Sequence, residues 1–208
     1  MIWLTWRQFR AQAITAAAAL ASGRVEKLDL DPGQKAGTLS GGQRAQLALT
    51  LAIAKRPELL ILDEPVASLD PLARREFLQD LMEAVAEQEL SVVLSSHLVA
   101  DLERVCDYLV VLVGSQVRIA GPVDELLAAH HVLAGPRRDP DTLPDNVQVI
   151  SASHTDVQTT LLVRTAGPIL DPAWTVSEVG LEDLVLAYMS QAAGRRRRDH
   201  RRHLEVQK

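Results

Sequence analysis

The chain has 208 residues, of which 47% are hydrophobic and 24% are charged, and its formal net charge is −5. This length allows one domain and a small second one, and the apolar fraction excludes wholesale disorder, collagen-like repeats and disulfide-rich scaffolds. The single cysteine, Cys106, cannot form an internal disulfide, which fits a reducing compartment.

Charge is distributed unevenly along the chain. The last fifteen residues, 194–208, carry seven of the 22 lysines and arginines but only two of the 27 acidic residues, which leaves a net charge of −10 in residues 1–193. An acidic body argues against a broad nucleic-acid-binding face. The run Arg195–Arg198 could contact anionic lipid headgroups or RNA, but a solvated, disordered tail is the favoured interpretation.

The first 22 residues are rich in alanine and contain Trp3 and Trp6. Their uncharged run, residues 11–23, has 13 residues, whereas a helix needs about 20 apolar residues to cross a bilayer. A transmembrane span is therefore not expected. Three interpretations stay open: an amphipathic helix at a membrane interface, a signal-like segment ending near Ala21, or a helix packed on the domain.

From Arg24 onward, the pattern predicts alternating helices and strands. Apolar spacing indicates a helix over residues 40–55, which ends before Pro57. The short apolar run 58–62 is typical of a strand buried in a parallel sheet. Asp70 and the proline after it are predicted to be the N-cap and first-turn residue of the next helix.

The alternation continues with a strand at residues 91–95 and a helix from about Leu98. A hairpin is predicted from strands 108–113 and 116–120, because Gly114-Ser115 between them is a turn signal. The order of strands and helices predicts an α/β fold with a largely parallel sheet.

A helix over residues 123–131 is predicted to precede a proline-rich break at 134–144. After the break, residues 147–150 and 158–164 are predicted strands, and 180–191 a terminal helix. We expect this part to be a small α+β appendage docked on the first part, since it is short for independent stability. The residues of the terminal helix expected to face inward are Leu181, Leu184, Val185 and Tyr188.

Two glycines follow a serine at the start of the predicted helix 40–55, in the sequence Ser40-Gly41-Gly42-Gln43. Glycines allow a ligand to approach the backbone closely, and the free N–H groups of a helix start favour an anion. Ser40 and Gln43 also satisfy the capping-box pattern, so a simple helix cap is the alternative interpretation.

Two adjacent carboxylates, Asp63 and Glu64, follow the predicted strand 58–62. Ligands of parallel sheets bind at the C-terminal ends of strands, so this pair suits a metal-bound phosphate. One carboxylate can hold Mg²⁺ through its waters, and the other can orient an attacking water. The alternative is an acidic corner between strand and loop. His97 follows the strand 91–95 and could reach the same edge, although a histidine there is more often an ordinary polar residue.

Four motifs in this order resemble the ATP-binding subunit of an ABC transporter: LSGGQ at 39–43, LLILDEP at 59–65, SLD at 68–70, and a strand followed by His97. The resemblance covers approximately residues 24–131. It implies a partial P-loop NTPase (ABC ATPase) fold that binds ATP and Mg²⁺ and hydrolyses ATP to power transport, with export implied by the appendage.

The same resemblance implies roles for individual residues. By this resemblance, the signature that grips the γ-phosphate of the partner subunit's ATP consists of Ser40, Gly41, Gly42 and Gln43. Asp63 corresponds to the Walker B aspartate at Mg²⁺, and Glu64 to the catalytic base. Asp70 corresponds to the D-loop residue at the dimer interface, and His97 to the switch histidine.

The resemblance also implies a membrane permease subunit and a second ATP-binding subunit as partners, with a cytoplasmic location at the inner face of the cell membrane. No nucleic acid is expected as a partner. ATP-dependent DNA-repair and chromosome proteins share a similar signature and form a weaker alternative. Their long coiled-coil insertions are absent from this sequence, and its body is acidic.

One required motif of the family is missing from the sequence. The P-loop pattern G-x-x-x-x-G-K-[ST] occurs nowhere in the 208 residues. Without it, Asp63, Glu64 and His97 would have no nucleotide of their own, and only the signature helix could act, on a partner's nucleotide. A non-catalytic remnant, or a module that supplies this helix to a partner, is therefore the alternative function.

The start of the chain explains this gap if the sequence is a chimera. Residues 3–10 resemble the opening of an ABC permease subunit, and we expect such a start to be joined to the C-terminal part of its ATPase. The expected organisation is an Ala-rich amphipathic segment at 1–21, an ABC ATPase domain without its P-loop portion at 22–133, an appendage at 134–193 and a basic disordered tail at 194–208.

Overall fold

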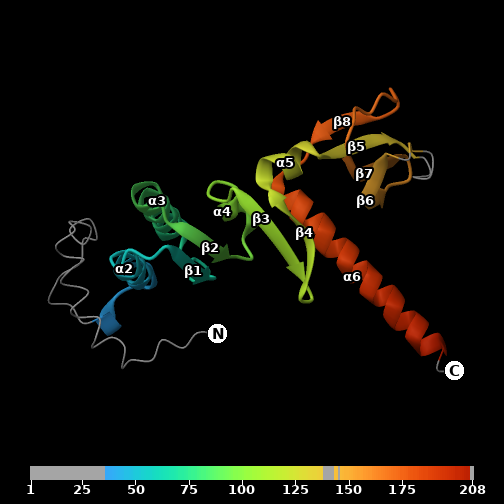
Figure 1. Ribbon diagram of the computed structural model, residues 1–208. Coiled ribbons are helices and arrows are strands. Elements are labelled where there is room, and N and C mark those ends of the chain that lie inside the picture. Colours follow the sequence, from blue (N-terminus) through green and yellow to red (C-terminus); the bar gives the residue numbers. More distant parts are fainter. Residues whose placement is uncertain (1–35, 138–142, 145, 207–208) are drawn as a thin grey trace. The chain divides into compact units, whose positions relative to one another are not determined.

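The computed structural model describes residues 36–137, 143–144 and 146–206 (Figure 1). The predicted N-terminal segment, with its resemblance to a permease, lies outside these residues. Contacts between residues divide the chain into two compact units, Met1–Leu98 and Val99–Lys208. Each unit is described by itself.

The described residues of the first unit form two helices and a pair of parallel strands (Figure 1). β1 and β2 are parallel, with Asp63 opposite Ser95, and α2 packs against α3. These elements confirm the predicted helices and strands of this region. Their bounds, after a 3-10 turn at Ala36–Thr38, are α2 (Gly41–Ile53), β1 (Leu59–Asp63), α3 (Pro71–Gln88) and β2 (Ser91–Ser95).

The start of α3 follows from local chemistry. The Oδ1 atom of Asp70 accepts hydrogen bonds from the backbone N–H groups of Leu72 at 3.0 Å and Ala73 at 3.1 Å. Pro71 occupies the first turn, where no N–H group is needed. Asp70 is thus the N-cap that its position before a proline predicts.

The parallel pair is less buried than its apolar sequence predicts. Successive side chains of a strand point to opposite faces, and Leu59, Ile61 and Val93 are 52%, 64% and 55% exposed. Ile61 and Val93 are direct cross-strand neighbours. One face of this sheet is therefore uncovered by the described residues, and the prediction of a fully buried strand is wrong for that face.

The second unit contains a hairpin, a four-stranded antiparallel sheet and a long helix (Figure 1). The sheet has the strand order β6-β7-β5-β8. The elements are α4 (Val99–Leu102), β3 (Tyr108–Val113), β4 (Gln116–Pro122), α5 (Val123–Ala128), β5 (His130–Pro136), β6 (Val147–His154), β7 (Gln158–Thr165), β8 (Thr175–Glu178) and α6 (Leu181–Val206).

The hairpin between β3 and β4 confirms the predicted turn. Gly114 and Ser115 both have left-handed backbone, with φ of 60° and 61°. A two-residue hairpin loop of this kind needs positive φ at both positions, because its twist then matches that of the strands.

Two strands of the second unit are not predicted by the local pattern. α5 ends at Ala128, so His130 and His131, predicted to be helical, begin β5 instead. β5 pairs with β7 along its length, from His130 opposite Arg164 onward, and this long-range pairing overrides the helical spacing. The expected domain boundary at residue 133 thus falls inside a strand, and β8 is the second element that the pattern does not predict.

The sheet is also less parallel than expected. Among the described strands, β1 and β2 are parallel, whereas β3 to β8 pair in antiparallel fashion. A two-residue turn can join antiparallel strands only, so the β3–β4 hairpin excludes a parallel arrangement there. The molecule is nonetheless the mixed α/β protein with a small α+β part that the sequence predicts.

α6 buries the predicted face. Leu181, Leu184, Val185 and Tyr188 are each at most 7% exposed and belong to one core cluster with residues of β3, β4 and α5. The helix continues to Val206, so the tail expected to be disordered from residue 194 is helical over most of its length. Arginine is a good helix former, which explains the continuation. No helix in the described ranges combines the length and apolarity needed to span a bilayer.

Candidate functional site

The C-terminal ends of β1 and β2 bring the two carboxylates and the histidine together. Because the strands are parallel and Asp63 lies opposite Ser95, the residues after each strand leave the sheet at the same edge. The Nδ1 atom of His97 lies 2.7 Å from Oε2 of Glu64. The Oγ atom of Ser95 donates a hydrogen bond to Oδ1 of Asp63 at 2.6 Å. The structure therefore places Asp63, Glu64 and His97 in one connected group.

Glu64 has an unusual backbone conformation. Its φ is 48°, in the left-handed region that residues with a side chain rarely adopt. Its N–H group donates to the backbone oxygen of Ser95 at 3.2 Å and to Oγ of Ser95 at 2.9 Å. Such strained residues cluster at sites where the geometry serves a function. These hydrogen bonds hold the first residue after β1 against the end of β2.

Ser95 is a site residue that sequence reasoning did not single out. Its hydroxyl group accepts from the backbone of Glu64 and donates to the carboxylate of Asp63, so one side chain positions both acidic residues. The signal that could have revealed it is the predicted parallel pairing, which puts a small polar residue of one strand end beside the carboxylates of the other.

The contact between His97 and Glu64 fixes the proton arrangement of the ring. An ionised carboxylate can only accept, so Nδ1 of His97 donates to it. Nε2 is then an acceptor in the neutral ring and a donor in the doubly protonated ring. The side chains of His97 and Glu64 are 63% and 39% exposed, so the pair lies at the surface of the described residues.

The donor set at this edge suits a magnesium ion that arrives with a nucleotide. In the ranges that the structure describes, no group of three or more acidic, histidine or cysteine side chains could hold a metal by itself. In phosphate-transfer sites Mg²⁺ uses only one or two carboxylates, and phosphates and waters complete its shell. Asp63 offers one exposed carboxylate, with Oδ1 held by Ser95. Asp63 and Glu64 thus fit Mg²⁺ together with a bound phosphate.

The signature residues form a complete helix cap. The Oγ atom of Ser40 accepts from the N–H group of Gln43 at 3.1 Å, and the N–H group of Ser40 donates to Oε1 of Gln43 at 2.9 Å. The capping box, offered as the alternative interpretation, is therefore present. It uses only acceptor atoms of the two side chains. The hydroxyl hydrogen of Ser40 and the amide hydrogens of Gln43 remain available to a phosphate, so capping and anion binding are compatible.

The two signature glycines have different surroundings. A Cβ atom added at Gly42 would lie 3.0 Å from Cβ of Ala73 in α3, whereas one added at Gly41 would have its nearest neighbour, the backbone oxygen of Ser68, at 3.7 Å. Gly42 therefore permits the packing of α2 on α3, while Gly41 leaves room above the helix start. The signature thus lies beside the segment that contains Asp70.

The predicted site residues form two groups in the first unit. Asp63, Glu64 and His97 meet at the sheet edge, whereas Ser40 to Gln43 lie beside the start of α3, where Asp70 uses its carboxylate as the N-cap. Within the described residues no hydrogen bond joins the two groups. This separation is compatible with two sites that act on different ligands.

Comparison with known proteins shows what this chain is similar to. A protein-family profile described as "AAA domain, putative AbiEii toxin, Type IV TA system" matches residues 27–100. The molybdenum import ATP-binding protein ModC of Rhodobacter capsulatus is 41% identical over 91 residues, which are 44% of this chain and 25% of that protein. The energy-coupling factor transporter ATP-binding protein EcfA2 of Symbiobacterium thermophilum is 41% identical over 107 residues, which are 50% of this chain and 37% of that protein.

A solved ATP-binding cassette of an ABC transporter, in its ADP conformation, aligns with 53% of this chain and 43% of its own, at 25% identity and a TM-score of 0.46. The chain spans between a quarter and about two fifths of the length of the curated relatives described above. The sequence similarity confirms that this chain resembles part of the ATP-binding subunit of an ABC transporter, as its motifs predict.

Proposed function

We propose that this chain acts within an ATP-binding subunit of an ABC-type transporter, in which hydrolysis of Mg·ATP powers transport through a membrane permease subunit. The observation that supports the proposal most strongly is the contact of 2.7 Å between His97 and Glu64 beside Asp63. It lies at the edge of a parallel sheet where phosphate ligands bind. It also lies within residues 27–100, the part matched by the family profile.

The residues at the sheet edge have complementary tasks in this proposal. Asp63 would hold Mg²⁺, which supplies charge neutralisation for the phosphates when it is bound. Glu64 orients the attacking water and takes its proton through Oε1. His97 keeps the carboxylate in place through Nδ1 and presents Nε2 toward the γ-phosphate. Ser95 keeps both acidic residues in register by its two hydrogen bonds.

The proposal includes the partners that the motifs imply. Ser40 to Gln43 would contact the nucleotide of a second ATP-binding subunit, and Asp70 would lie at the interface of that dimer. The pair would act at the inner face of the cell membrane, on a permease. We propose export as the direction; because the ModC relative is named for import, direction needs its own assay in vesicles.

A reconstitution experiment tests the signature residues. The purified 208-residue chain is added to a full-length ABC ATP-binding subunit whose own signature has been inactivated, and phosphate release is measured. We expect the chain to restore turnover and Gly41→Ala to abolish the restoration, because a methyl group there blocks close approach of a phosphate. Ala48→Ser, at an exposed position of the same helix, is the matched control. Failure of the unchanged chain to restore turnover would contradict the proposal.

A second candidate function is a non-catalytic module that only supplies the signature helix. It is supported by the fully formed cap of α2, which leaves its phosphate donors free without help from the sheet edge. Glu64→Gln distinguishes the two functions. A catalytic role predicts phosphate release by the chain alone that this variant lowers by about 10²–10⁴-fold, whereas a pure signature module predicts no such release. Binding of Mg·ATP by the chain alone, measured by calorimetry, provides a second test of the catalytic role.

A further inference from the structure

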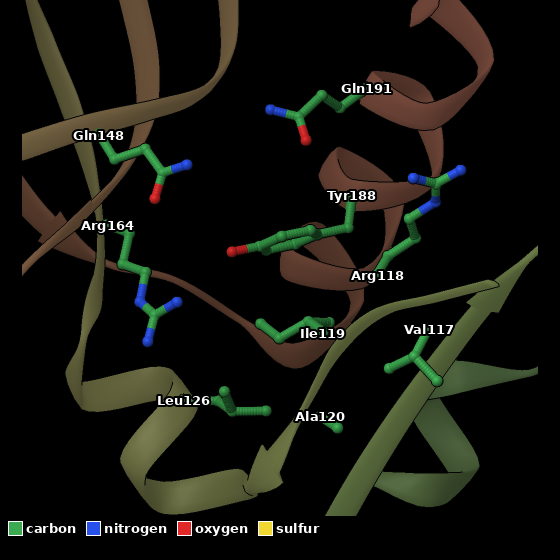
Figure 2. Close-up of a pocket in the computed structure, with 9 residues that line it drawn as sticks. All are labelled: Val117, Arg118, Ile119, Ala120, Leu126, Gln148, Arg164, Tyr188 and Gln191. Carbon is green, nitrogen blue, oxygen red and sulfur yellow. The ribbon is translucent and has the colours of Figure 1, made fainter. Parts of the chain in front are cut away.

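A pocket in the second unit is lined by none of the residues discussed so far as nucleotide ligands. It has a volume of about 370 Å³ and is lined by residues of β4, α5, β6, β7 and α6 (Figure 2). Cavities that hold small molecules start at about this size. Its polar lining residues are Arg118, Gln148, Arg164, Tyr188 and Gln191, and no acidic residue lines it.

Strand pairing positions the first arginine. Arg164 of β7 is directly opposite His130 of β5 on one side and Gln148 of β6 on the other. Directly opposed residues share one face of a sheet. In Figure 2 the amide of Gln148 and the hydroxyl of Tyr188 point into the same space beside Arg164. A guanidinium and an amide thus meet over one face of the sheet.

The wall formed by Tyr188 is fixed by a buried histidine. His130 is fully buried, and its Nδ1 lies 2.6 Å from the backbone oxygen of Leu126, to which it must donate. Nε2 therefore accepts the hydroxyl proton of Tyr188, at 2.9 Å. Burial lowers the pKa of His130, so the ring stays neutral and the positive charge at the pocket comes from arginines.

The second arginine has an unused donor. The Nε atom of Arg118 is buried and has no hydrogen-bond partner in the part of the chain that the structure describes. Because this atom is closed to solvent, a ligand in the pocket could contact Arg118 through its terminal nitrogen atoms only. No carboxylate pairs with Arg118 or Arg164 among the described residues.

We propose that this pocket binds a small organic anion. Its carboxylate or phosphate group would contact Arg164, with Gln148 and Gln191 as further donors, because guanidinium groups match these oxyanions in charge and geometry. Its body would lie against the apolar wall formed by Ile119 and Leu126. The proposal does not rest on the function proposed for the first unit.

Titration of the full 208-residue chain tests the pocket. We would follow the Nε–H resonances of the arginine side chains by NMR while adding benzoate, inorganic phosphate or, as an uncharged control, benzyl alcohol. We expect a saturable shift of the Arg164 resonance with benzoate and none with benzyl alcohol. A response to phosphate as strong as that to benzoate would assign the site to phosphate groups and also supports the proposal. No saturable shift with either anion up to about 10 mM would overturn it.

Two variants distinguish binding in the pocket from a general effect of the chain's charge. Arg164→Gln should weaken benzoate binding by about tenfold or more, as expected for the loss of a charged hydrogen bond. Arg137→Gln removes one charge from an exposed position of the same unit and should bind as the unchanged chain does. Equal binding by Arg164→Gln and Arg137→Gln would overturn the proposal. Should Arg164→Gln fail to fold, the resonances of the unchanged chain still decide the outcome.

Discussion

Replacing Tyr188 with phenylalanine removes one hydroxyl group from the core of the second unit. That hydroxyl is the donor to Nε2 of His130, whose side chain is fully buried and whose other nitrogen already donates to Leu126. Tyr188→Phe therefore leaves a buried acceptor without a donor. The two rings also pack edge to face, with centroids 5.7 Å apart and an interplanar angle of 73°, and phenylalanine preserves that packing.

The expected cost is about 1–2 kcal/mol of unfolding free energy. An unpartnered buried polar group costs about 1–3 kcal/mol, and the adjoining pocket lined by Tyr188 can admit a water molecule, which favours the lower part of that range. Tyr108→Phe is the matched control, because Tyr108 is 54% exposed. Its cost should stay within about 0.5 kcal/mol.

Urea denaturation followed by far-ultraviolet circular dichroism measures both variants. The slope of the free energy with urea should be unchanged, because the surface exposed on unfolding is the same. If Tyr188→Phe costs no more than Tyr108→Phe, the hydrogen bond to His130 contributes nothing to stability and the expected cost of an unpartnered acceptor is refuted.

Three further predictions concern single groups. Burial lowers the pKa of His130 below 6.5, so the unfolded state binds the proton more readily than the folded state. The free energy of unfolding should therefore fall as the pH drops below 6.5. NMR titration of the ring measures this pKa, and an ordinary pKa would contradict the prediction. Gly135→Ala should lower the free energy of unfolding by about 1–3 kcal/mol in urea denaturation. The new Cβ would lie 2.7 Å from a backbone oxygen and 2.8 Å from a tryptophan ring. Gly167→Ala, whose new Cβ would have its nearest neighbour at 3.8 Å, should cause no such loss. Ser95→Ala should destabilise the first unit by about 1 kcal/mol in the same assay, because it removes the hydroxyl that bridges the two acidic residues. Ser91→Ala, at the other end of the strand, should have no effect. Equal losses of unfolding free energy in the two variants would argue against the bridging hydroxyl.

Local signals in the sequence predicted much of the fold. The N-cap at Asp70, the turn at Gly114-Ser115 and the inward face of α6 each depend on residues close together in the chain, and the structure confirms all three. The strand β5 depends instead on pairing with β7, about thirty residues away. The residues after Ala128 continue the helical spacing of α5, so the local sequence does not show where the helix ends. The strand β5 could therefore not be predicted from it.

The candidate site was predictable in composition but not in geometry. Motif spacing singled out Asp63, Glu64 and His97, and parallel pairing explains why they meet. The bridging role of Ser95 and the left-handed backbone of Glu64 depend on hydrogen bonds between strand ends, which no periodicity encodes. The capping box at Ser40 was foreseen as an alternative to anion binding, whereas the atoms involved allow both.

At position 64, the backbone conformation favours one type of residue and the proposed chemistry requires another. A φ of 48° suits glycine or asparagine better than glutamate, so a library of this chain selected for stability alone should drift toward those residues at position 64. Under the proposed function, selection for turnover would instead keep the carboxylate in spite of the strain.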